Sequence, residues 1–219
     1  MLTESSLQFL YDLSQNNNRD WFEKNKARYE KEVKKPFEQT VDALISRMRT
    51  FEPAFNVQAK DCIFRIYRDT RFSADKTPYK TNVSAVLTRG GRKTQHEPGY
   101  YLEVTFGACN LGGGAYFLEK PDLHKVRTAI AQDPETFRSI VGEQAFVDIF
   151  GDLQGEKNKV MPPEFKEAAK KEPYLYNKQF YFWKELPPET ALGEGFVELA
   201  ARYFEAARPV NEFLRGALG

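Results

Sequence analysis

The sequence predicts an α+β fold: an antiparallel sheet of about four or more strands in the middle of the chain, packed against N-terminal and C-terminal helices. Apolar residues recur at helical spacing in residues 1–55 and 121–219, and they alternate with period two in residues 60–118. Strands gathered in one central block favour an antiparallel sheet with helices on one face. Because 219 residues can bury a sizeable core and no linker divides them, we expect a single domain over residues 1–219.

The N-terminal part predicts two helices. The first runs from about Thr3 to Ser14, and "NNN" at 16–18 ends it. Asn17 is the expected N-cap of the second helix, because it places Asp20 at the third helical position. Apolar residues at positions 29, 33, 37 and 41 stay in phase across Pro36, so we expect a kink there rather than a new direction.

The middle of the chain predicts three or four strands with turns between them. "RGGRKTQHEPG" and "GACNLGGG" contain the residues typical of turns. The glycine run at 112–114 is therefore expected to form a hairpin turn or a bulge. The alternating segments are residues 62–67, 83–88, 100–106 and 115–117.

Helical patterns return after the sheet. We expect a helix from near Pro121, another with Asp133 as N-cap and Pro134 at its first position, and a short helix closed by Pro173. A last helix is expected over residues 195–207. The aromatic segment "YLYNKQFYFW", 174–183, is expected in the core or at its edge, with a mobile lid as the alternative.

Composition excludes several broad classes. A net charge of +1 argues against a general nucleic-acid or membrane binder, and no run approaches the roughly 18 apolar residues of a membrane span. The N-terminus lacks the pattern of a signal peptide, so we expect a cytoplasmic protein. Cys62 and Cys109 are then expected to be reduced, partly buried thiols.

One segment departs from this neutral balance. Residues 60–93 hold nine basic and three acidic residues, a local charge of +6. Its centre is "RIYRDTRFSADKTPYK", residues 65–80, where the alternating pattern ends after Ile66 and a loop begins. Arginine offers a planar fork that matches phosphate or carboxylate, so this loop is the first candidate for a site.

We interpret residues 65–82 as a site for a phosphorylated or other anionic small molecule, with or without catalysis. In this hypothesis Asp69 and Asp75 orient the arginines, or one of them acts as a general base, and Tyr79 donates a hydrogen bond. Phe72 must be buried, and the guanidinium groups must converge on one side. The residues expected to hold the anion are Arg65, Arg68, Arg71, Lys76 and Lys80.

Two alternatives remain open. The stretch can be purely structural, with Asp69 and Asp75 paired to two arginines and Glu103 paired to Arg65. It can also be the face of a non-catalytic module that binds RNA or an acidic protein. This second alternative ranks lower because the common RNA-binding signatures are absent. The oligomeric state is not predicted.

Other motifs carry little weight. Ser73 and Lys76 have the S-x-x-K spacing of some acyl-transfer enzymes, but they lie in a loop and no companion motif follows. His96 and His124 are isolated, so no metal site is expected. The glycines match neither a Walker loop nor a dinucleotide fingerprint, and no cofactor is expected. Trp21 and Phe22 are expected mostly in the core.

Three stretches together show a resemblance to a known family. They are "NNNRDWFEKNKARYEKEVKKPF", "FRIYRDTRFSADKTPYKTN", and "GYYLEV" with the later "GGG". Over nearly its whole length the chain resembles the conserved hypothetical proteins called domain of unknown function 2461. The resemblance implies a single intracellular domain and no particular reaction. It marks the segment from Arg65 to Asn82 as the signature of the family.

Overall fold

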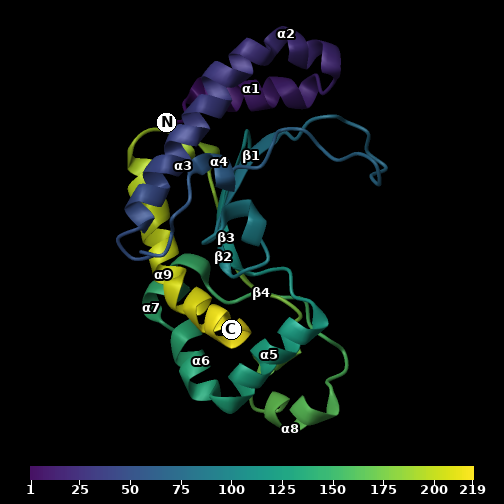
Figure 1. Ribbon diagram of the computed structural model, residues 1–219, viewed down its shortest axis with the longest axis vertical. Coiled ribbons are helices and arrows are strands. Elements are labelled where there is room, and N and C mark those ends of the chain that lie inside the picture. The colour runs from purple at the N-terminus through teal and green to yellow at the C-terminus, as the bar shows by residue number, and fades with distance from the viewer.

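The computed structural model describes residues 1–219, and its centre is one four-stranded antiparallel sheet. The strands lie side by side in chain order, and the connection from the third to the fourth is long because it contains residues 116–179. This arrangement confirms the predicted α+β fold (Figure 1). The strands are β1 (Asn82–Leu87), β2 (Gly99–Thr105), β3 (Cys109–Ala115) and β4 (Phe180–Leu186).

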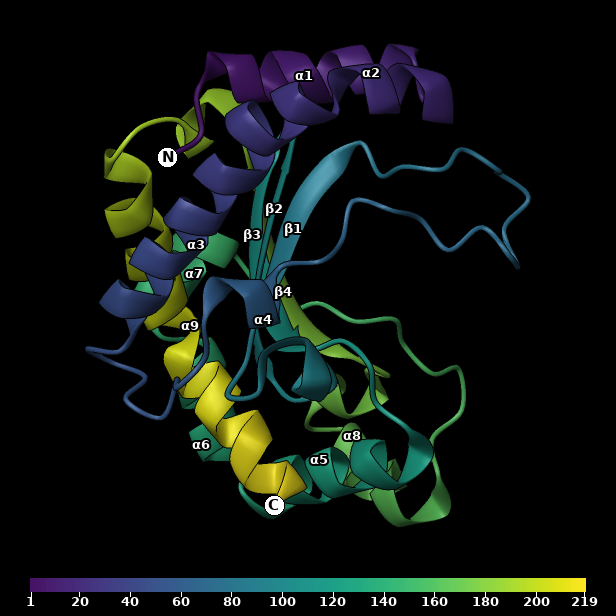
Figure 2. The same ribbon diagram turned by 45° about the horizontal axis from the view of Figure 1, so that its top comes forward.

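Nine α-helices surround the sheet. The long helices α3 and α9 pack together on one of its faces, while α1 and α2 lie at one end of the molecule and α5, α6 and α8 at the other (Figures 1 and 2). No helix combines the length and the apolar character needed to cross a membrane. The helices are α1 (Glu4–Gln15), α2 (Arg19–Tyr29), α3 (Lys35–Met48), α4 (Ala59–Cys62), α5 (Lys120–Gln132), α6 (Pro134–Val141), α7 (Gln144–Phe150), α8 (Lys166–Ala169) and α9 (Gly195–Leu218).

The strand register gives the sheet one apolar face and one mixed face. Val83, Val104 and Cys109 share a row, and so do Ala85, Leu102 and Leu111. All six are buried, and they join a single cluster of 49 buried apolar residues that includes the inner sides of α3 and α9. Because side chains alternate along a strand, the opposite face carries the residues between them.

The helical path from α2 to α3 is irregular one turn before Pro36. Residues Glu30–Lys34 form a π-helical turn, and Pro36 lies in the first turn of α3. Proline has no amide hydrogen to offer the carbonyl of Glu32 four residues earlier, and the hydroxyl of Ser6 in α1 donates to that carbonyl. The helical path is therefore disturbed by one extra residue in the turn before Pro36. Ser6 of α1 supplies the hydrogen-bond donor that the proline lacks.

The N-cap of α2 is Asn18, so the expected cap at Asn17 is wrong by one residue. Oδ1 of Asn18 accepts a hydrogen bond of 2.9 Å from the backbone N–H of Trp21. The side chain of Asn17 instead binds the backbone of Tyr79 from both sides, accepting from its N–H at 3.1 Å and donating to its carbonyl at 2.9 Å. The Asn17 side chain is therefore bound to a segment 62 residues away and does not cap α2.

One expected strand and one expected turn are also wrong. Residues 62–67 form no full strand: α4 ends at Cys62, and only Ile63 and Phe64 pair with β1, through a bridge to Ala85 and a bond to the Ser84 carbonyl. The glycine run at 112–114 is no turn but the middle of β3. The edge strand β4 comes from the aromatic segment, so its expected place in the core or at its edge is confirmed.

The remaining helices follow their patterns with one extension. Asp133 caps α6 by accepting from the N–H of Thr136 at 3.0 Å, as expected. The last helix continues past Pro209 to Leu218. Cys62 and Cys109 are buried free thiols, and burial raises the pKa of each to about 12.

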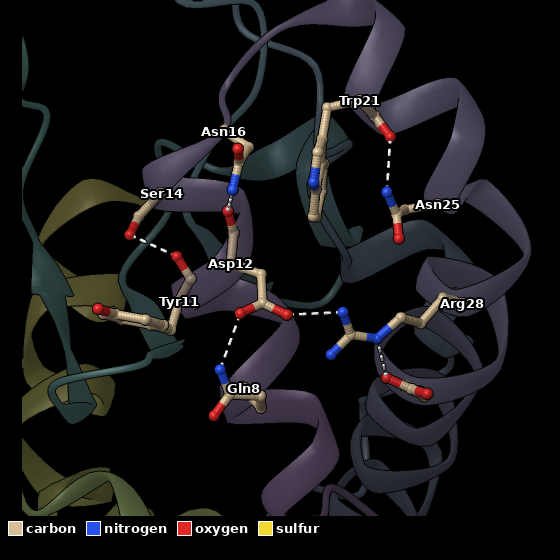
Figure 3. A network of polar contacts seen from close by, with 9 residues as sticks. Gln8, Tyr11, Asp12, Ser14, Asn16, Trp21, Asn25 and Arg28 are labelled. Carbon is tan, nitrogen blue, oxygen red and sulfur yellow. Dashed lines mark hydrogen bonds and ion pairs between the residues drawn. The ribbon is translucent and has the colours of Figure 1, made fainter.

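Arg28 joins α1, α2 and the π-helical turn through two carboxylates. Its Nη1 donates to Asp12 at 2.6 Å and its Nε donates to Glu32 at 2.7 Å, while Gln8 donates to the other oxygen of Asp12 at 2.8 Å (Figure 3). Burial opposes the charge of Asp12, but the bonds from Arg28 and Gln8 outweigh it and lower the pKa of this carboxyl. The network fixes the two N-terminal helices to each other.

Candidate functional site

The mixed face of the sheet, opposite α3 and α9, carries an aromatic pair over a glycine. Tyr101, Gly112 and Trp183 are neighbours in one row of the register. The rings of Tyr101 and Trp183 lie 5.8 Å apart and nearly parallel, at 26°. A Cβ atom at Gly112 would lie 2.5 Å from Cε3 of Trp183, so glycine is required for this ring to lie flat on β3.

A pocket of about 650 Å³ lies on this face. This volume suits an organic ligand of moderate size. Eight of the residues that line it are aromatic; Lys80 is the one basic residue of the lining and Glu97 is the one acidic residue. The lining includes Phe64, Lys80, Tyr101, Tyr116, Phe117, Tyr181 and Trp183.

Lys80 is positioned by the backbone beside the sheet edge. Its N–H donates to the carbonyl of Ile66 at 2.7 Å, and its Nζ lies 5.0 Å from the ring centroid of Phe64. The ammonium group forms no ion pair with any carboxylate. Burial, followed by repulsion from Arg65, lowers the pKa of Lys80. The pocket wall therefore holds a partly desolvated cation that forms no direct ion pair, although the more distant charge of Glu103 attracts it.

A polar row lies next to the aromatic row. The carboxylate of Glu103 accepts from Asn82 at 2.6 Å, from the hydroxyl of Tyr101 at 3.1 Å and from Asn110 at 3.2 Å. Burial, opposed in part by Ser84, raises the pKa of Tyr101, and the Glu103 charge adds to the rise. Glu103 does not pair with Arg65, so that part of the structural alternative is wrong. Its carboxylate holds the Tyr101 ring at the pocket.

Exposed aromatic side chains gather at the rim. Tyr116 and Phe117 follow directly after β3 and are 53% and 58% exposed. The Tyr116 ring lies edge-on to both Phe117, at 5.0 Å, and Tyr181, at 5.2 Å. His96 meets Phe117 edge-on at 5.6 Å. Exposed apolar surface concentrated at the mouth of a pocket is typical of a ligand-binding site.

The segment singled out from the sequence forms an extended arm, defined here as residues 65–80. Its two sides pair at the base, where Tyr67 bridges to Tyr79 and the N–H of Arg68 donates to the carbonyl of Pro78 at 2.9 Å. Figures 1 and 2 show it reaching out from β1 beyond the strands and helices around it. Of the residues of the arm, only Lys80 at its base lines the pocket.

Phe72 contradicts the expectation that it anchors the arm in the core, because its side chain is 95% exposed. The arm projects too far for Phe72 to reach the apolar cluster. The compact pocket expected from the whole loop, which required a buried Phe72, is therefore not formed.

The outer charges of the arm neutralise each other in pairs. Arg68 donates to Asp75, and Arg71 donates to Asp69 through Nε at 2.9 Å and Nη2 at 2.6 Å. The bond from Arg71 lowers the pKa of Asp69 to about 2, and the bond from Arg68 lowers that of Asp75 to about 2. Arg65, in contrast, forms no ion pair.

The other residues expected in the site are divided between the arm and the core. Nζ of Lys76 donates to the carbonyl of Thr70 at 2.8 Å and not to Ser73. Tyr79 is buried, with its ring stacked on Phe22 at 4.0 Å. Phe22 is fully buried as expected, whereas Trp21 is partly exposed.

A second, smaller hollow lies where the arm meets the start of α2. It measures about 470 Å³, and its lining contains no apolar side chain except a proline. Two cations, Arg19 and Lys76, contribute to it. The lining residues are Asn17, Asn18, Arg19, Thr70, Lys76, Thr77 and Pro78.

Sequence reasoning missed the pocket although one of its signals was present. Tyr101 and Glu103 occupy outward positions of β2. The outward face of such a strand is normally polar, so the aromatic ring of Tyr101 was the signal of a covered site. Trp183 gave no such signal, because its partner strand precedes it by about seventy residues. No three His, Cys, Asp or Glu side chains lie together in a group that could hold a metal ion. His124 lies 3.6 Å from the carboxylate of Glu164.

Comparisons with known proteins agree with the resemblance seen in the sequence. The model of one family, described as "Conserved hypothetical protein (DUF2461)", matches residues 5–213. Neither a curated protein nor a solved structure matches the chain. Since the match covers almost all of the 219 residues, this chain belongs to the DUF2461 family of conserved hypothetical proteins.

Proposed function

We propose that the pocket on the mixed face of the sheet binds an organic anion with a flat ring. One observation carries the proposal: Lys80, a partly desolvated cation that forms no direct ion pair, lies in the wall of a pocket lined by eight aromatic residues. A charge in such surroundings is disfavoured unless an opposite charge joins it. A bound carboxylate or phosphate group would supply that charge.

Lys80 and Arg65 are the members of the predicted anion-binding set that this proposal retains. They lie close enough for the charge of Arg65 to disfavour that of Lys80. An anion between them would be attracted by both and would relieve their repulsion. Arg65 is exposed, so it would meet the anion from the solvent side.

The aromatic walls would hold the ring of the ligand. Tyr101 and Trp183 present nearly parallel rings that β3 and Glu103 keep in place. Tyr116 and Phe117 are exposed at the mouth and can cover a bound ring. Aromatic pairs contribute about 0.5–1.5 kcal/mol beyond their buried area, so stacking would favour flat rings over aliphatic anions.

A thermal-shift panel tests the proposal. It compares flat anions (adenosine monophosphate, indole-3-acetate) with a phosphate that lacks an aromatic ring (glucose 6-phosphate) and a ring without charge (adenosine). We expect at least one flat anion to raise the melting temperature and the two half-matched probes to act weakly. Ligand at a hundred times its Kd adds about 2.7 kcal/mol to stability, which such a scan detects.

Two lysine variants locate the effect. Lys80→Met keeps the aliphatic stem on Phe64 and removes the charge, so it should abolish the shift. Lys93→Met is the matched control, because Lys93 is exposed and lies outside the pocket lining. A shift that survives in Lys80→Met, or that Lys93→Met removes equally, would assign the anion to another surface.

A further inference from the structure

The exposed end of the arm has a feature that the pocket does not explain. Phe72 is the most exposed of the large apolar side chains, and its ring lies 5.7 Å from the guanidinium carbon of Arg71. Tyr67, at the base of the arm, is 45% exposed. The arm therefore presents two aromatic rings to solvent with arginines between and beside them.

The arm is held in shape by its own bonds and by the turn between α1 and α2. Asn17 binds the backbone of Tyr79 in both directions, which fixes the base. Farther out, the Arg68–Asp75 pair crosses the arm, the Arg71–Asp69 pair fixes one side of it, and Asp75 also accepts from the N–H of Thr77 at 2.9 Å. The ring of Phe72 is consequently displayed by an ordered segment, so less freedom is lost when it meets a partner.

The net charge of the arm is positive, although Arg68 and Arg71 are each paired with an aspartate. The arm holds five basic and two acidic residues, and Arg19 of α2 adds a further cation where the arm meets that helix. The polar hollow between them, with Arg19 and Lys76 in its lining, is open to an anionic group. The arm thus places one cation, Arg71, beside an exposed aromatic ring and another, Lys76, in the lining of the polar hollow.

We propose that the arm binds single-stranded nucleic acid without sequence preference. Phe72 and Tyr67 would stack on bases, and Arg19, Arg71 and Lys76 would contact the phosphates. Proteins that bind single strands combine cationic grooves with aromatic stacking platforms in this way. Arg71 keeps N–H groups free beyond its pair with Asp69, because its side chain is 77% exposed.

The same observations disfavour a protein partner. A protein interface has an apolar centre of several fully buried residues. Around Phe72 there is no such patch: the neighbours are charged or polar, and the adjoining hollow has no apolar side chain except Pro78. One exposed ring with an arginine beside it, on an arm of net positive charge, is more complementary to a base and its phosphates than to an apolar interface.

Fluorescence anisotropy tests the proposal with labelled twelve-nucleotide strands of dT and rU and the full-length protein. We expect binding at 50 mM salt that weakens as salt rises, with a slope of about −0.7 per phosphate contact. Phe72→Ala should weaken binding about tenfold or more, as expected from the loss of one stacked base. Because Phe72 contacts almost nothing, the variant should melt like the wild type.

Controls separate stacking from simple charge. Phe106→Ala removes an exposed aromatic residue that lies outside both the arm and the pocket lining, and it should leave the affinity unchanged. Poly-glutamate, a polyanion without bases, should displace the strand poorly. Absence of binding at 50 mM salt, equal affinity of Phe72→Ala and wild type, or equal displacement by poly-glutamate would each overturn the proposal. None of these results bears on Lys80, so the pocket is tested separately.

Discussion

Arg215 and Glu52, 163 residues apart in the chain, meet at 2.7 Å between Nη2 and Oε1 in the interior. Their side chains are only 10% and 4% exposed. The hydroxyl of Tyr100 donates to the same carboxylate oxygen at 2.8 Å. This buried contact joins the end of α9 to β2 and to the loop after α3, so it ties together three segments of the fold.

Arg215→Met should destabilise the protein strongly. The variant leaves the Glu52 carboxylate buried without a cation, and breaking a buried pair in this way costs about 3–5 kcal/mol. Urea unfolding measures the change. The double variant Glu52→Gln/Arg215→Met should be more stable than Arg215→Met, because the amide still accepts from Tyr100 and carries no charge. A double variant less stable than the single one would show that the pair is not the cause.

Arg127→Met should cost far less, although Arg127 is 4% exposed. This guanidinium has no carboxylate partner; Nη2 donates to the Asn177 carbonyl at 3.0 Å and Nε has no acceptor. Burial lowers the pKa of Arg127, which indicates that its surroundings disfavour the charged form. Its removal loses one hydrogen bond that contributes about 1 kcal/mol, but it also removes the unfavourable desolvation of a buried charge. Parallel urea curves decide: a loss as large as that of Arg215→Met would contradict this account.

Gly112→Ala should displace Trp183 from the sheet. The new methyl group would lie 2.5 Å from the indole ring, and such overpacking costs about 1–3 kcal/mol. Thermal melting measures the loss, and tryptophan emission in a Trp21→Phe background reports the move of Trp183, the other tryptophan of the chain. Gly216→Ala is the control, since nothing surrounds that position in α9 and it should stabilise by up to about 1 kcal/mol.

The Asp12–Arg28 contact should make stability depend on acid pH. The folded pKa of Asp12 is lowered, so its contribution is present above the unfolded value of about 3.9 and is lost as pH falls through the folded value. Asp12→Asn should therefore be less stable than wild type at pH 7, and the gap should close below about pH 4. Urea unfolding at pH 7, 5 and 3 measures it. A gap that stays constant with pH would mean that the carboxylate charge contributes nothing.

The amino-acid sequence by itself determined the α+β class, the central block of strands and the positions of most helices. Local physical chemistry is enough for these features. Period-two alternation in residues 100–106 places one set of side chains on each face of a strand, and Asp133 with Pro134 starts α6 wherever that segment lies. The arm was also identified from sequence, because its charge and turn residues are adjacent in the chain.

Only the tertiary structure decided which of these residues form a site. Whether Phe72 is buried depends on how far the arm projects, which no local pattern encodes. Asn17 caps no helix because Tyr79, 62 residues away, binds its side chain. The pocket likewise depends on Trp183 stacking beside Tyr101 over Gly112, across strands that are distant in the chain. Such contacts follow from strand register and packing, in which the energies of many distant residues compete, and alternation within one segment does not determine them.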